Sequence, residues 1–311
     1  MELNSKIFVA GHRGLVGSAI VRKLNDLGYN NVITRTRQEV DLMDSASVKN
    51  FFDSEKPEYV FLAAARVGGI LENDTKSAEF IYQNLQIQNN VIHHAYTSGA
   101  KKLLFLGSNC IYPKYSEQPI KEEYLLTGEL EPTNKSYAVA KIAGIEMCQA
   151  YRKQYGFNCI SIMPGNMYGE NDNYDLESSH VFAALIQKFK DAKQSGSPSV
   201  ELFGDGSPMR EFLYSDDLAI ACIMAMNRYD SPIPVNVSSG VEYPIKDVAQ
   251  MVSDAVGFEG EVIWNTSLPN GTLRKRLDLT RIHSIGWSPQ TDLDDGIRMA
   301  LEFYREHKAN K

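Results

Sequence analysis

The stretch Lys6-Ile7-Phe8-Val9-Ala10-Gly11-His12-Arg13-Gly14-Leu15-Val16-Gly17 decides the fold. Its first half is a short apolar run typical of a buried strand, and residues 15–27 continue with the spacing of an amphipathic helix. Between them, glycines at positions 11, 14 and 17 allow a tight turn, close approach of a pyrophosphate and close packing of helix on strand. The exposed N–H groups at a helix N-terminus bind phosphate. The stretch therefore predicts a dinucleotide-binding turn.

The same alternation of strand and helix continues outward from this turn. Further strands are expected at 31–34, 59–63, 102–106 and 159–163, and helices at 45–52, 80–95 and 137–155. Strands that alternate with helices form a parallel sheet covered on both faces. We therefore expect an α/β fold with a doubly wound parallel sheet, that is, a Rossmann fold.

The rhythm changes after about residue 165, where the chain becomes rich in Gly, Asn, Asp and Ser. Helices are expected at 181–193, 216–226, 245–256 and 293–304, and extended segments at 200–203 and 234–237. We expect residues 1–165 to form the Rossmann domain, to which segments near 205–240 return. Residues 166–311 then form a smaller, interleaved C-terminal substrate-binding region.

Composition narrows the class of protein. The 311 residues carry a net charge of −7, which argues against a nucleic-acid partner. No apolar run approaches the ~20 residues of a membrane span, and the N-terminus lacks the pattern of a signal peptide. The four cysteines have no metal-type spacing and are too few for a disulfide framework. We expect a cytoplasmic protein with reduced thiols, no membrane association and no metal.

The end of the second expected strand discriminates between cofactors. NAD-binding proteins usually carry an acidic residue there, on the ribose 2′-hydroxyl. This chain has Thr34-Arg35-Thr36-Arg37 instead, and a guanidinium pairs well with a 2′-phosphate. Arg13 in the glycine turn could reach the same phosphate. The residues therefore favour NADP.

A second motif indicates redox chemistry at a carbonyl group. Tyr137 and Lys141 lie four residues apart on an expected helix and so share one face. A nearby ammonium favours the phenolate, which would let the tyrosine exchange a proton with a carbonyl oxygen. Ser108 follows the strand that ends at Leu106 and could hydrogen-bond the same oxygen.

With these motifs the chain resembles the extended short-chain dehydrogenase/reductase superfamily and, more narrowly, the GDP-L-fucose synthase family within it. The resemblance covers almost the whole chain. Its marks are residues 11–19, Ala63-Ala64-Ala65-Arg66-Val67-Gly68-Gly69-Ile70, Phe80-Ile81-Tyr82-Gln83-Asn84, residues 106–114, Glu131-Pro132-Thr133-Asn134 and Pro208-Met209-Arg210-Glu211-Phe212.

The resemblance assigns roles to particular residues. Ser108, Tyr137 and Lys141 match the reductase group, and Cys110 and His180 match an acid/base pair for epimerisation. Lys188, Phe203, Arg210 and Asp278 fall where the family contacts the GDP-sugar. The implied NADP contacts are Gly11, His12, Arg13, Gly14, Leu15, Val16, Gly17, Arg37, Asp41, Leu42, Ala64, Leu106, Gly107, Tyr137, Lys141, Pro164, Asn166, Met167 and His180.

The implied chemistry suits these residue types. In a 4-keto sugar, C3 and C5 both flank the C4 carbonyl, so an enolate can form when either loses its proton. Inversion needs a base on one face of the ring and an acid on the other. Thiols and imidazoles ordinarily titrate near ~8.5 and ~6.5, close enough to neutrality for either part. Which of Cys110 and His180 is the base stays open.

Three departures from the family pattern leave the identity of the sugar open. Phe203 stands where a tryptophan is expected, and Asn109 and Gly165 where serine and threonine are expected. One alternative is an enzyme that only reduces a GDP-4-keto sugar, for example a GDP-6-deoxy-heptose. Another is a non-catalytic NADP sensor.

Single residues also have structural interpretations. Cys110 could be a core residue, His180 a helix cap, Lys188 a surface lysine, and Arg210 a partner of Glu211 or Asp217.

The long expected helices 80–95 and 137–155 predict a homodimer. They carry apolar residues on more than one side, namely Ile81, Leu85, Ile92, Ile145 and Tyr151. A surplus apolar face favours a partner. In the superfamily these two helices form a four-helix bundle with their copies.

Overall fold

The computed structural model describes residues 1–268 and 270–307. Its strands are β1 (Ile7–Ala10), β2 (Val32–Ile33), β3 (Tyr59–Leu62), β4 (Lys102–Leu106), β5 (Asn158–Pro164), β6 (Asn166–Tyr168), β7 (Ser199–Phe203), β8 (Met209–Tyr214), β9 (Val235–Val237), β10 (Glu242–Pro244), β11 (Glu261–Asn265) and β12 (Arg274–Lys275). Its helices are α1 (Leu15–Asp26), α2 (Ser45–Glu55), α3 (Ile70–Thr75), α4 (Ser77–Thr97), α5 (Lys135–Tyr155), α6 (Val181–Ser195), α7 (Ser215–Arg228), α8 (Ile245–Val256), α9 (Thr280–Ser284) and α10 (Leu293–His307).

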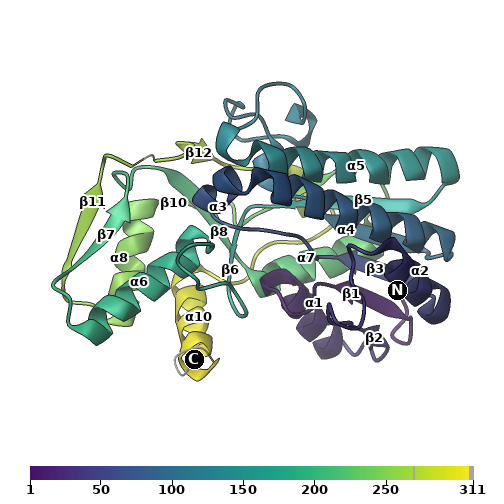
Figure 1. Ribbon diagram of the computed structural model, residues 1–311, viewed down its shortest axis with the longest axis horizontal. Helices are drawn as coiled ribbons and strands as arrows, with labels where there is room; N and C mark the ends of the chain where they lie inside the picture. Colours follow the sequence, from purple (N-terminus) through teal and green to yellow (C-terminus); the bar gives the residue numbers. More distant parts are fainter. Residues whose placement is uncertain (269, 308–311) are drawn as a thin grey trace.

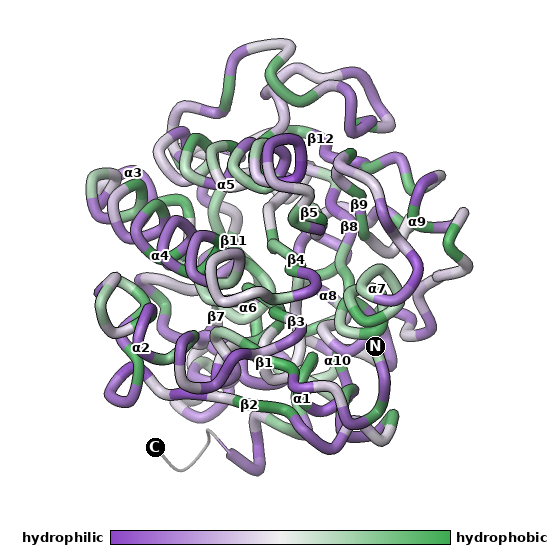
Figure 2. Tube along the Cα trace, turned by 90° about the vertical axis from the view of Figure 1, so that its right-hand side faces the viewer, coloured by the Kyte–Doolittle hydropathy of each residue, from purple (hydrophilic) through white to green (hydrophobic). Residues whose placement is uncertain are grey.

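The main sheet confirms the expected doubly wound architecture. Its six strands run in the order β2-β1-β3-β4-β5-β9, and every neighbouring pair is parallel. Helices α1 and α7 pack together on one face, while α2, α4 and α5 cover the other (Figure 1). The strands β1, β4 and β5 run through the middle as apolar segments between the two helical layers (Figure 2). Strands buried on both faces are apolar throughout for this reason.

The C-terminal part builds a second hydrophobic core. Side chains of α6, α8 and α10 pack there with β7 and with alternate residues of β8 (Figure 1). In contrast, α7, β9 and Ile282 of α9 belong to the core around the main sheet. The chain thus crosses between the two cores several times after residue 165.

The sequence analysis did not predict seven of these elements. They are α3, β6, β8, β10, β11, β12 and α9. Strand β8 joins a small sheet in which β6, β10 and β12 are its partners. Helices α4 and α5 begin three and two residues earlier than predicted, at Ser77 and Lys135. As a result, Tyr137 lies in the first turn of α5, at the edge of the sheet where the site forms.

The four cysteines are free, as expected. Within the described ranges no helix is long and apolar enough to cross a membrane. The cytoplasmic location stays a prediction.

Candidate active site

The glycine turn between β1 and α1 is shaped by very close backbone contacts. A Cβ on Gly17 would lie 2.1 Å from the carbonyl oxygen of Gly11, and a Cβ on Gly11 would lie 2.7 Å from the Ala64 nitrogen. Gly11 also has a φ of +89°, which favours glycine. Gly14 is the N-cap of α1 and has no side chain to bond the first N–H groups of the helix. The first turn therefore offers unpaired donors to a phosphate, which fits a dinucleotide.

The two arginines after β2 have different surroundings. Arg35 is held in place by Glu55, by the Thr34 carbonyl oxygen at 2.8 Å and by the face of the Phe51 ring. Arg37 is 74% exposed, and its nearest carboxylate is that of Asp41 at 3.7 Å. Glu39 lies in the same loop as Arg37, and its carboxylate affects the pKa of His12 in the glycine turn, as does Arg13 of that turn. The loop after β2 therefore adjoins the glycine turn. Arg37 is therefore the guanidinium that remains available for an anion beside the turn.

The other predicted cofactor contacts gather along one edge of the main sheet. Leu106 ends β4 and Pro164 ends β5, while Gly107 follows β4 directly and Ala64 lies two residues after β3. Just beyond, Asn166 and Met167 lie on β6, and the Leu42 carbonyl is held at 2.9 Å by the Asn90 amide. The carboxyl ends of parallel strands form the edge at which α/β proteins bind ligands. Which of these residues touch the cofactor stays a prediction.

The predicted reductase group assembles where β4 meets the first turn of α5. Lys141 is 3% exposed, and its ammonium nitrogen donates to the Leu106 carbonyl oxygen at 2.8 Å. The same nitrogen lies 5.9 Å from the centre of the Tyr137 ring. Ser108 caps a short 3-10 turn, Asn109–Ile111, by accepting a hydrogen bond from the Cys110 N–H at 3.2 Å. Phe80 packs edge-on against Tyr137, with ring centres 6.3 Å apart.

Electrostatics in the ligand-free site correct one expectation. We expected the Lys141 ammonium to favour a Tyr137 phenolate. Instead, burial raises the pKa of Tyr137, Cys110 adds to the rise, and hydrogen bonding to the Ser108 hydroxyl lowers it only in part. Burial also lowers the pKa of Lys141 to about 7, which weakens its positive charge. Tyr137 is therefore a protonated phenol near neutrality, the form that donates a proton.

Neither Cys110 nor His180 is buried in the core. Cys110 is half-exposed, whereas the other three cysteines are buried, so the core interpretation of Cys110 is wrong. Its thiol lies close enough to Tyr137 and to Arg210 to affect the pKa of each. His180 occupies the N-cap position of α6, but its side chain makes no capping bond. The surrounding protein lowers the pKa of His180 by desolvation, although the side chain stays open to solvent.

Arg210 presents a half-buried positive charge that no carboxylate of the described residues neutralises. Its guanidinium donates to the Met209 carbonyl oxygen at 2.7 Å, and desolvation lowers its pKa. Glu211 accepts instead from the Leu277 N–H, and Asp217 from the N–H groups of Gln290 and Thr291. The ion-pair interpretation of Arg210 is therefore wrong, and its charge is available to an anionic ligand.

The other predicted substrate contacts form two separate groups. Lys188 donates to the Glu201 carbonyl oxygen at 2.8 Å and lies over the Phe203 ring, 5.0 Å from its centre. That ring is 60% exposed and offers a flat apolar surface. Asp278 accepts a hydrogen bond from the Thr280 N–H at 2.9 Å, which stabilises the start of α9. The structure gives Asp278 this local role, and its contact with a substrate stays a prediction.

One residue that the sequence analysis quoted without a role holds the loop beside the site. Asn84 is 2% exposed, and its amide bonds both the N–H and the carbonyl oxygen of Arg66, each at 3.0 Å. The same loop continues to Gly69, whose N–H donates to the Ser178 carbonyl oxygen at 2.9 Å. Asn84 thereby places the segment that carries His180.

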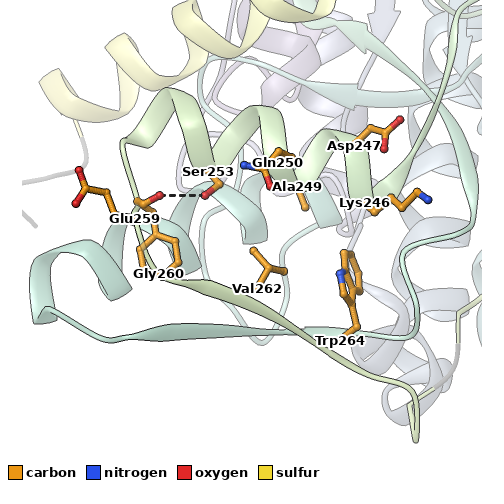
Figure 3. Close-up of a pocket in the computed structure, with 10 residues that line it drawn as sticks. Lys246, Asp247, Ala249, Gln250, Ser253, Glu259, Gly260, Val262 and Trp264 are labelled. Atoms are coloured by element: carbon orange, nitrogen blue, oxygen red, sulfur yellow. Dashed lines mark hydrogen bonds between the residues drawn. The ribbon is translucent and has the colours of Figure 1, made fainter.

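A hollow of about 630 Å³ lies elsewhere, between α8 and β11 (Figure 3). Trp264, Val262 and Lys246 contribute to its walls. None of its lining residues is a predicted site residue. The chemistry of the site is therefore not located in this hollow.

Comparison with known proteins agrees with the geometry. Residues 7–238 match the model of the NAD dependent epimerase/dehydratase family. GDP-L-fucose synthase 1 of Arabidopsis thaliana is 54% identical over 310 residues, covering 100% of this chain and 96% of the relative. GDP-L-fucose synthase of Escherichia coli strain K12 is 46% identical and covers 97% of each. A solved structure of a GDP-mannoheptose C4 reductase from Campylobacter jejuni with NADP bound is 42% identical, with a TM-score of 0.89 over 98% of this chain and 99% of that one.

The unpaired charge of Arg210 predicts a conflict between stability and binding. Arg210→Met should raise the free energy of unfolding by about 1 kcal/mol, because a half-buried cation without a carboxylate partner is removed. Arg274→Met is the matched control, since Arg274 pairs with the Glu242 carboxylate, and its loss should destabilise the protein. Urea denaturation of both variants without ligand measures whether each substitution raises or lowers the free energy of unfolding. A clear loss of stability in Arg210→Met would show that the guanidinium has a structural partner.

Proposed function

The chain belongs to the NAD dependent epimerase/dehydratase family, and we propose that it converts GDP-4-keto-6-deoxy-D-mannose to GDP-L-fucose by NADPH-dependent 3,5-epimerisation and 4-keto reduction. One observation carries the proposal: the Ser108 hydroxyl and the protonated Tyr137 phenol lie together, with the Cys110 thiol beside them. A single site for the C4 oxygen thus has proton-transfer groups within reach. A family member without catalysis would not need this assembly.

Epimerisation uses the residues that face the site from two sides. One of Cys110 and His180 takes the proton from C3 or C5, and the electrons move onto the C4 oxygen as an enolate. Ser108 and Tyr137 donate hydrogen bonds to that oxygen and stabilise its charge. The other member of the pair returns a proton to the opposite face of the same carbon. Desolvation lowers the pKa of His180, which favours the neutral imidazole, the form that accepts a proton.

Reduction uses the same oxygen site. NADPH, when bound, supplies the hydride that C4 accepts. Tyr137 donates its phenolic proton to the C4 oxygen, which completes the hydroxyl. Because burial raises the pKa of Tyr137, the proton is present near neutrality. Lys141 holds its ammonium against the Leu106 carbonyl and fixes the N-terminal turn of α5 beside β4.

The anionic part of the substrate finds its counterpart in Arg210. A guanidinium pairs well with phosphate oxygens, and this one has no carboxylate partner in the described part of the chain. Phe203 offers an exposed ring on which a planar base can stack, with Lys188 on its other side. Together with Asp278 these residues form the proposed GDP-sugar site.

A reductase that acts only at C4 is the second candidate. The solved GDP-mannoheptose C4 reductase is 42% identical to this chain, so the fold and much of the sequence are shared with an enzyme of that type. The two candidates differ in whether the C3 and C5 protons exchange with solvent. Product analysis by NMR after incubation with GDP-4-keto-6-deoxy-mannose and NADPH separates them.

We also propose that the chain forms a homodimer, but two of the apolar residues that led to this prediction are not on the surface. Ile92 and Ile145 are 0% exposed and belong to the core, so they contribute no surplus apolar face. The support comes from α4 and α5, which lie side by side on the outer face of the molecule (Figure 1). Tyr82 on α4 and Val139 on α5 are 57% and 37% exposed. Light scattering at micromolar concentration should give twice the chain mass, and a mass of one chain would argue against the bundle.

The surroundings of Arg37 predict a preference for NADPH. Arg37→Glu should raise the KM for NADPH by about tenfold or more, because a charge-assisted pair with the 2′-phosphate is lost. The KM for NADH should change by less than about threefold. Arg35→Gln is the matched control: it removes a guanidinium bound to Glu55 and should leave the ratio of the two KM values unchanged. Equal losses for both cofactors in Arg37→Glu would contradict the assignment.

Because Cys110 is proposed to act in epimerisation and Tyr137 in reduction, substituting each residue should impair a different step. Cys110→Ser keeps the shape but replaces the thiol with a far less acidic hydroxyl, so exchange of the C3 and C5 protons with deuterated solvent should slow strongly. Some direct hydride transfer to the ketone should remain. Tyr137→Phe should instead cut C4 reduction by about 10²-fold or more, because the proton donor is gone. Some exchange should survive in Tyr137→Phe, since Ser108 can still hold the enolate oxygen.

Solvent deuterium incorporation by NMR, measured beside NADPH consumption, checks both variants. Wild-type exchange at both carbons in Cys110→Ser would show that the thiol has no part in epimerisation. That result would favour the C4 reductase.

A further inference from the structure

Asn109 lies between two residues of the site, yet its own side chain is buried. It is 4% exposed, while Ser108 and Cys110 on either side are half-exposed. The short turn Asn109–Ile111 produces this alternation, and it places the Asn109 side chain behind the Cys110 thiol. The Cys110 sulfur lies 3.8 Å from the Asn109 Oδ1 atom, as a donor to it. The carboxamide is therefore a direct neighbour of the sulfur.

The other end of the carboxamide makes no hydrogen bond. The Asn109 Nδ2 atom is buried, and no acceptor among the described residues bonds it. Buried amide groups without a partner are uncommon and call for an explanation. A serine, the residue expected at this position in the family, would not bring such a group into the core. The unpaired NH2 group therefore calls for an explanation in terms of the groups around it.

The two ends of a carboxamide suit the two protonation states of a thiol. An amide oxygen accepts a hydrogen bond from S–H, and an amide NH2 group donates one to a thiolate. The two ends have nearly the same shape, so a half-turn about the Cβ–Cγ bond exchanges them without a change in packing. Because Nδ2 has no partner, the exchange breaks no other hydrogen bond. The sulfur can thus keep a partner when its proton leaves.

We infer that Asn109 is a positioning residue that holds the Cys110 sulfur in both protonation states by exchanging the ends of its carboxamide. This inference rests on the proposed role of Cys110 in epimerisation. The proton that leaves the thiol goes to the substrate enolate carbon or to solvent, and the same number of protons returns when the thiolate accepts one. Asn109 itself gains and loses none.

Other groups near the sulfur do not supply the same contact. Tyr137 on α5 and Arg210 on β8 are the titratable groups of the described residues that respond to the charge of Cys110. Arg210 contributes positive charge, which favours a thiolate, but its printed hydrogen bond goes to the Met209 carbonyl. Tyr137 is engaged by the C4 oxygen of the substrate during the reaction. The Asn109 carboxamide is therefore the group that can hydrogen-bond the Cys110 sulfur both before and after the thiol loses its proton.

The test measures the reactivity of Cys110 without substrate, in the full chain. Iodoacetamide alkylates thiolates, so its rate against pH reports how readily the thiol ionises. Cys110→Ser is the control for the site of reaction, because the other three cysteines are buried. Asn109→Leu keeps the approximate volume but can neither accept nor donate. Asn109→Asp can accept, cannot donate when ionised, and adds a negative charge.

Both variants should slow alkylation about tenfold at pH 8, the factor that one ordinary hydrogen bond is worth. The midpoint of the pH profile should move upward by about one unit. NADPH affinity and the melting temperature should stay near those of the wild type, which separates the effect from a general loss of structure. Asn109→Ala is the variant of choice if Leu or Asp prevents folding, and it should shift the midpoint in the same direction.

A wild-type pH profile in Asn109→Ala or Asn109→Leu would overturn the inference. The result is independent of the proposed function, because alkylation needs no sugar substrate. If the wild-type protein failed to exchange the C3 and C5 protons while the profile still shifted, the epimerase proposal would fall and the contact between Asn109 and Cys110 would stand.

Discussion

The carboxyl edge of the parallel sheet is the constraint on which the rest of the structure depends. Each strand of such a sheet ends at the same edge, so residues far apart in the sequence meet there. The turn after β1, Ala64 after β3, Ser108 after β4 and Pro164 at the end of β5 are brought together in this way. The close contact of Gly17 with Gly11, where a Cβ would lie 2.1 Å from a carbonyl oxygen, fixes the first of these turns. A larger side chain at either position would displace α1 and with it the phosphate site.

The site keeps several polar groups in surroundings that do not satisfy them. Lys141 carries its amine into the core, where burial lowers its pKa to about 7, and Arg210 has no described carboxylate partner. Such groups reduce stability, because their interactions with water are lost without full replacement. They are prepared instead for ligands that supply the missing partners. The loss of stability and the readiness to bind have the same physical origin.

The positions of the residues proposed to contact the substrate depend on the second hydrophobic core. Arg210 lies on β8, whose residues 212 and 214 pack into that core while Leu213 packs toward the main sheet. His180 begins α6, which also packs there, and Asn84 fixes the neighbouring loop from the side of the main sheet. The proton-transfer pair therefore joins residues from both cores. The relative position of the two cores sets the separation of Cys110 and His180.

The sequence by itself determined the Rossmann architecture and the glycine turn, while the roles of the proposed proton-transfer residues stay predictions. Apolar runs and helical spacing are local signals, so β1 to β5 and the longer helices between them, α1, α2, α4 and α5, could be predicted from short windows. The starts of α4 and α5 were misplaced by a few residues, because polar first turns carry no periodic signal. The domain boundary near residue 165 and the exact cofactor contacts stay predictions.

Only the tertiary structure decided which of these residues are free to act. Arg35 and Arg37 are indistinguishable as sequence, but Glu55, twenty positions later, engages the first and leaves the second exposed. Ile92 and Ile145 look like a surface stripe until the packing of α4 on α5 buries them. Strand β8 was missed because its partners β6, β10 and β12 come from distant parts of the chain. Pairing, burial and desolvation arise from contacts between remote residues, and so no local pattern contains them.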